Sequence, residues 1–220
     1  MFTSTRIASF FICLVLLMPG MVMAQAEADV EMQKQALFAL SQRPDAESIP
    51  FLSDLAQTHQ RAEIRKQALF WLGQKGSAEA LAALETIAAQ SDDPVVQEQI
   101  IFAYSQRPDD EGVPLLINAA RTHEDPELRQ KAIFWLGQKD SETVQTFFDE
   151  LLASDIDLET KEQVIFAYSQ FPNEKSVPAL INIARSDAPT EIRKKAVFWL
   201  GQSSDPEARD FLADLIEEEF

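Results

Sequence analysis

Apolar and polar positions along the chain follow a pattern that recurs every 32 residues without an insertion. In the copy over residues 126–138, the apolar side chains have the i, i+4, i+7 and i+8 spacing of one helical face, at Leu128, Ala132, Trp135 and Leu136. Asp125 before a proline is typical of a helix start, and Gly137 is typical of a helix end. A second helical pattern follows over residues 142–153. Each copy therefore predicts two helices.

The six copies alternate between two types. Copies two, four and six carry FWLGQ, whereas copies one, three and five carry FALSQ or FAYSQ. The full unit is a pair of copies, 64 residues long, and three pairs fill residues 29–220. Because Trp71 stands where the flanking copies have Ala39 and Ala103, we expect a large ring to face a small methyl group. One helix pair cannot bury its apolar side alone, so the pattern predicts an all-α, right-handed α-solenoid of six two-helix repeats.

The first 24 residues differ from the repeats. Arg6 is their only charge, and the apolar run over residues 7–17 is shorter than the roughly 20 residues of a membrane span. A charged start, a short apolar run and a final small residue, Ala24, are typical of a secretory signal peptide. We predict cleavage after Ala24, export to the periplasm and no membrane insertion afterwards. The predicted parts are a signal peptide, a short segment and the solenoid, over residues 1–24, 25–28 and 29–220.

Composition narrows the function further. The formal net charge is −17, which repels the phosphates of nucleic acid and anionic lipid and disfavours both as partners. The only cysteine, Cys13, lies in the predicted signal peptide, so the exported chain has no thiol. No glycine-rich phosphate loop is present, and no nucleophile stands beside a base. We therefore expect no catalytic, cofactor-binding or metal-binding residues.

Three segments resemble a known family. ELRQKAIFWLG, from Glu127, and EIRKKAVFWLG, from Glu191, resemble the first helix of the short HEAT-like repeat first described in phycobilisome lyases. SVPALINIAR, from Ser176, resembles the second helix of that repeat. The family mostly mediates protein contacts, so the resemblance implies a non-catalytic scaffold of the bacterial cell envelope that binds another protein. The odd copies depart from the family pattern, because serine replaces its glycine at Ser41, Ser105 and Ser169.

The same family also contains enzymes, so an enzyme or lyase-type subunit is the alternative function. One enzyme of the family, deoxyhypusine hydroxylase, has a di-iron site built from repeated His-Glu pairs. Here only His123 is followed by a glutamate, whereas His59 is followed by Gln60. One pair cannot hold two irons, so the resemblance does not extend to that site.

Two sets of repeated residues are candidates for a partner-binding surface. Six phenylalanines are predicted to form a row along one side of the solenoid, each four residues before a glutamine: Phe38, Phe70, Phe102, Phe134, Phe166 and Phe198. Such a row is either an exposed ridge for a partner or a seam that closes the contact between neighbouring repeats.

The second set lies on the outer face of the second helices, which we expect to line the concave side: Asp54, Gln57, Asn118, Arg121, Asn182 and Arg185. This face suits an extended or acidic peptide, or is ordinary solvated helix surface. Polar residues near both ends of the solenoid favour a monomer over end-to-end assembly.

Overall fold

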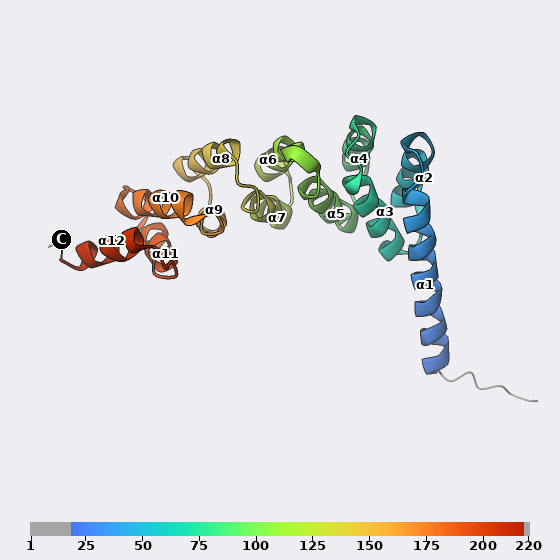
Figure 1. Ribbon diagram of the computed structural model, residues 1–220, viewed down its shortest axis with the longest axis horizontal. Coiled ribbons are helices and arrows are strands. Elements are labelled where there is room, and N and C mark those ends of the chain that lie inside the picture. The colour runs from blue at the N-terminus through green and yellow to red at the C-terminus, as the bar shows by residue number, and fades with distance from the viewer. Residues whose placement is uncertain (1–18, 218–220) are drawn as a thin grey trace, which may run out of the picture.

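The computed structural model describes residues 19–217, and this part of the chain forms helices and no strand (Figure 1). The predicted all-α fold is thereby confirmed. The helices are α1 (Pro19–Ser41), α2 (Asp45–Thr58), α3 (Ala62–Gln74), α4 (Ala78–Gln90), α5 (Pro94–Ser105), a 3₁₀ turn η1 (Pro108–Asp110), α6 (Val113–Thr122), α7 (Pro126–Leu136), α8 (Glu142–Ala153), α9 (Leu158–Tyr168), α10 (Asn173–Arg185), α11 (Thr190–Leu200) and α12 (Pro206–Glu217).

The helices stack in two rows (Figure 1). The odd-numbered helices, which are the first helices of the repeats, form the lower row in Figure 1, and the even-numbered second helices form the upper row. The stack arches so that the first-helix row lies on the inner side and the second-helix row on the outer side. The arrangement is an α-solenoid of three modules, comprising α1–α4, α5–α8 and α9–α12.

Helix ends follow the local sequence signals. The side chain of Asp125 accepts a hydrogen bond from the backbone N–H of Glu127, and α7 then runs to Leu136 with Gly137 as its C-cap. Asp157 caps α9 in the same way, and its hydrogen bonds with the backbone N–H and hydroxyl of Thr160 lower the pKa of its carboxyl. Short helices gain from such caps because their first N–H groups have no partner inside the helix.

The predicted signal peptide falls mostly outside the described residues. Of residues 1–24, only residues 19–24 are described, and they form the start of α1. The predicted cleavage position after Ala24 thus lies within a helix that continues to Ser41. Among residues 19–217, no helix combines the length and the apolar character that crossing a membrane requires.

Where one module meets the next, neighbouring first helices touch through their smallest residues. A Cβ atom at Gly73 would lie 2.9 Å from the carbonyl oxygen of Ala103, and one at Gly137 would lie 2.8 Å from the Cβ of Ala167. Real Cβ atoms do not approach other atoms this closely, so only glycine fits at both places without a shift of the helices. Glycine opposite alanine therefore sets the distance between modules.

Inside each module a tryptophan separates the first helices instead. The ring of Trp71 lies 5.2 Å from that of Phe38, and the later modules repeat this pair with Trp135–Phe102 and Trp199–Phe166. The prediction that each tryptophan ring packs against an alanine was therefore wrong, because each ring packs against a phenylalanine of the preceding first helix. Trp71 and Gly73 are two residues apart, roughly 200° around the helix, so the ring faces the preceding helix and the glycine faces the following one.

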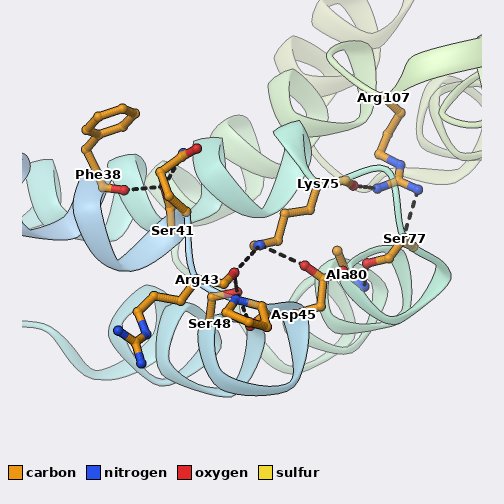
Figure 2. A network of polar contacts seen from close by, with 11 residues as sticks. Phe38, Ser41, Arg43, Asp45, Ser48, Lys75, Ser77, Ala80 and Arg107 are labelled. Carbon is orange, nitrogen blue, oxygen red and sulfur yellow. Dashed lines mark hydrogen bonds and ion pairs between the residues drawn. The ribbon is translucent and has the colours of Figure 1, made fainter.

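Cationic side chains connect the turn within one repeat to the same turn of the preceding repeat (Figure 2). The Lys75 ammonium lies 2.8 Å from the Asp45 carboxylate, which lowers the pKa of that carboxyl. The fully buried Arg107 donates hydrogen bonds to the carbonyl oxygens of Lys75 and Ser77. Further along, the series continues with Lys139–Asp110 and Lys175–Asp140. These contacts fix the angle between successive repeats.

The glycine contact between modules can be tested by adding one methyl group. Gly137→Ala should lower the free energy of unfolding by about 1–3 kcal/mol, because the added Cβ overlaps Ala167 across the module boundary. The measurement is urea denaturation followed by circular dichroism. Gly201→Ala is the matched control, since Gly201 is exposed and occupies the same place after the last first helix. It should change the stability by no more than about 0.5 kcal/mol, and equal effects of both substitutions would contradict the packing described here.

Candidate binding surfaces

Nine aromatic side chains form a continuous row along the first helices. Starting from Phe38, the ring contacts alternate between tilted, edge-on and stacked geometry. Within a repeat, Phe70 meets the edge of Trp71 at 4.9 Å, and between modules Phe70 stacks on Phe102 at 6.2 Å with an interplanar angle of 13°. The edge contact recurs at 5.1 Å in the second and third modules, and the stacking recurs at 6.4 Å between these two modules. We call this set the aromatic row: Phe38, Trp71, Phe70, Phe102, Trp135, Phe134, Phe166, Trp199 and Phe198.

The rings of the aromatic row pack between neighbouring first helices, and some of them are also exposed to solvent. Phe38, Phe134 and Phe198 are 45%, 36% and 55% exposed, whereas Phe70, Phe102 and Phe166 are half-buried. Figure 2 shows Phe38 pointing away from the second helix of its repeat. The six phenylalanines thus lie in a row as predicted, and features of both the ridge and the seam are present.

The glutamines that follow the phenylalanines border the aromatic row. In the first repeat the Ser41 hydroxyl donates to the carbonyl oxygen of Phe38 and accepts a hydrogen bond from the Gln42 amide. The same arrangement recurs in the odd repeats of the other two modules, at Ser105–Gln106 and Ser169–Gln170. The serine that replaces the family's glycine thus closes the helix end and orients the glutamine. Sequence reasoning noticed the serine but not this role.

Charged residues beside the aromatic row are paired between neighbouring first helices. Lys131 lies 2.8 Å from Glu98, and Lys195 lies 2.7 Å from Glu162 in the next module. These four side chains are partly exposed, so each pair adds little to stability. The two pairs neutralise the carboxylates of Glu98 and Glu162, which stand one helical turn before Phe102 and Phe166.

The second predicted surface is arranged differently from the prediction. Its six residues are exposed: Asp54, Gln57, Asn118, Arg121, Asn182 and Arg185. They lie on α2, α6 and α10 in the outer row, so the prediction that they line the concave side was wrong (Figure 1). Both arginines of this set have side-chain partners within the chain. The Arg121 guanidinium stands 4.9 Å above the Phe147 ring and pairs with Glu150, and Arg185 stands 5.1 Å above Phe211.

The two histidines stabilise turns. Nδ1 of His59 accepts a hydrogen bond from the backbone N–H of Arg61 at 3.1 Å, and His123 repeats this with Asp125. Arg65 and Arg129 donate to the carbonyl oxygens of these histidines and tie each turn to the following helix. Within residues 19–217, no group of three or more histidine, cysteine, aspartate or glutamate side chains is placed to hold a metal ion.

These features define a class of protein, the α-solenoids built from two-helix repeats. Comparison with family models matches residues 21–105 and 113–193 to HEAT repeats and residues 192–218 to the PBS lyase HEAT-like repeat. The chain therefore belongs to the HEAT repeat family.

Other comparisons add a structural likeness only. The search of curated proteins gives no match. Among solved structures, human deoxyhypusine hydroxylase in complex with glycerol is similar, with 22% sequence identity and a TM-score of 0.40. The match covers 85% of this chain and 73% of that one. At this level of similarity, nothing about the activity of the hydroxylase follows for this chain.

The half-exposed position of the aromatic row predicts a modest stability effect. Phe134→Ala should lower the free energy of unfolding by about 1–2 kcal/mol, because the contacts of the ring with Trp135 and Phe166 are lost. Phe148→Ala is the comparison, since Phe148 is fully buried and its removal should cost about 3–5 kcal/mol. Both values come from chemical denaturation at equilibrium. A loss at Phe134 as large as that at Phe148 would mean that the ring serves the core alone.

Proposed function

We propose that this protein is a non-catalytic scaffold that holds another protein against the inner side of its arch. The observation that supports this function is the aromatic row, in which three phenylalanines remain exposed. Clusters of exposed aromatic side chains are rare on monomeric proteins, and they supply much of the binding energy where proteins meet. A row that follows the first helices from α1 to α11 suits a large or elongated partner.

The surroundings of the aromatic row also suit a protein partner. Protein interfaces combine an apolar centre with a polar rim and few uncompensated charges at the centre. Here the rings are bordered by glutamines such as Gln42, and two carboxylates beside the rings pair with lysines, as Glu98 does with Lys131. Such a surface favours a partner that offers apolar and hydrogen-bonding groups, in contrast to a nucleic acid or an anionic lipid.

The non-catalytic part of the proposal rests on the uses that the reactive side chains already have. Both histidines hold turns, and several aspartates cap helices or pair with lysines. Groups engaged in this way act as structural elements of the repeat. The alternative, an enzyme or a lyase-type subunit, is a property of some HEAT-like proteins and has no specific support in the geometry of this chain.

A capture experiment tests the binding surface. Tagged chain is expressed in its host, crosslinked and purified, and bound proteins are compared between variants. Phe134→Ser combined with Phe198→Ser should abolish capture of the partner, because two of the three exposed rings are removed from the inner side. The control is Phe51→Ser combined with Ile216→Ser, which removes exposed apolar side chains from α2 and α12 of the outer row. Capture by a folded Phe134/Phe198 variant at the wild-type level would refute this surface.

We also propose that the protein acts in the periplasm as a monomer, and that its partner is an envelope or exported protein. The proposal is supported by the composition of residues 1–24, with one charge, a short apolar run and a small residue at the end. Mass spectrometry of the protein purified from its host should give an N-terminus at Gln25. An intact Met1 on cytoplasmic protein would contradict export.

A further inference from the structure

A groove of about 720 Å³ opens between α4 and α6 in the second-helix row. Its floor is the buried side of α5, with Ile100, Ile101 and Tyr104. Its walls are short, because they are formed by alanines such as Ala88 from α4 and Ala119 from α6. The groove is thus apolar at its base and open to solvent. A volume of this size is in the range of sites that hold several apolar groups of a ligand.

The rim of the groove is acidic. Glu85 and Asp92 border it on one side, and Glu124 and Asp125 border it on the other. No lysine or arginine is among the residues that line it. Carboxylates that share a concave surface reinforce one another's potential, and an apolar floor weakens the screening by water. The groove therefore favours a ligand that is apolar in the middle and cationic on both sides.

The equivalent place between the second and third modules, where α8 and α10 stand for α4 and α6, is filled by the chain itself. Sixty-four residues later, Ala88 is replaced by Leu152, Asp92 by Ile156 and Ala119 by Ile183. These three larger side chains are half-buried and pack against the core. The hydroxyl of the equivalent tyrosine, Tyr168, lies within hydrogen-bond distance of the Asp149 carboxylate, at 2.5 Å, and of the Gln145 carbonyl oxygen, at 3.0 Å. The boundary between the first and second modules thus lacks apolar side chains that the boundary between the second and third modules places in the same position.

We propose that the groove between α4 and α6 binds an extended segment of a partner protein in which one or two aliphatic or aromatic side chains are flanked by lysine or arginine. The apolar side chains occupy the space above Ile100 and Ile101 whose equivalent, between the second and third modules, is filled by Leu152 and Ile183. The flanking cations meet the carboxylates of Glu85 and Glu124 at the two rims. This inference goes beyond the proposed function, because the groove opens in the outer row and the aromatic row lies on the first helices.

The test starts from a library of random dodecapeptides displayed on phage. Selection on the wild-type protein should enrich sequences with an apolar residue between lysines or arginines. The enriched peptides are then synthesised with a fluorescent label, and their binding is measured by fluorescence polarisation. Ala88→Leu combined with Ala119→Ile copies the boundary between the second and third modules and leaves the charge unchanged, so it should weaken binding by about tenfold or more. Ala82→Leu, at an exposed position of α4 outside the groove, should leave it unchanged.

A second variant tests the rim independently of the filled floor. Glu85→Gln combined with Glu124→Gln should weaken peptide binding several-fold at low salt and reduce its dependence on salt. Both residues are exposed, so the variant should fold as the wild type does. Three outcomes would overturn the proposal: enriched peptides without flanking cations, equal binding to the filled variant, or peptide binding lost through Phe134→Ser on the inner side instead. Self-association of the wild-type chain that is abolished by filling the groove would identify a second copy as the occupant and would also overturn it.

Discussion

The close contact of glycine with alanine between modules is the constraint on which the rest of this structure depends. Gly73 lies against Ala103, and Gly137 lies against Ala167. A Cβ atom at either glycine would come within 2.9 Å of an atom of the neighbouring first helix. The phenylalanines of these helices consequently stack on one another across the boundary. Close packing in the first-helix row makes it the shorter of the two rows, so the stack bends around it (Figure 1). The curvature of the stack, the stacking in the aromatic row and the groove in the outer row thus follow from the same close packing of the first helices.

The 64-residue period follows from the same constraint. A helix that presents glycine to one neighbour has to fill the wider gap to its other neighbour, and Trp71 does this by packing on Phe38. Two kinds of interface therefore alternate, one close and one filled by a ring, and the sequence requires two kinds of repeat to make them. Within residues 19–217 no first helix follows Gly201, and this glycine is exposed.

The fold could be predicted from the sequence, because helices are specified locally. The cap at Asp125 and the glycine at Gly137 are short-range signals, and they bound α7 within two residues of the prediction. The concave side and the partner of each tryptophan depend on distances between helices, which spacing along one chain does not encode. For the same reason the sequence did not show that Arg121 has a partner within the chain, namely the ring of Phe147 on the next second helix. The groove did leave a signal in the sequence, since Ala88 and Leu152 differ at equivalent positions of two modules.

The way in which the exposed rings are held affects how they can bind. Phe134 is in contact with Trp135 and Phe166, so its ring is fixed by the packing of the solenoid and does not sample many rotamers in the free protein. A partner that covers such a ring gains apolar contact without the entropic cost of ordering a mobile side chain. The inner side therefore suits binding by a rigid, preformed surface. The rings that stabilise the repeat are the same rings that the proposed partner would cover, so the proposed binding role requires no change in the packing of the aromatic row.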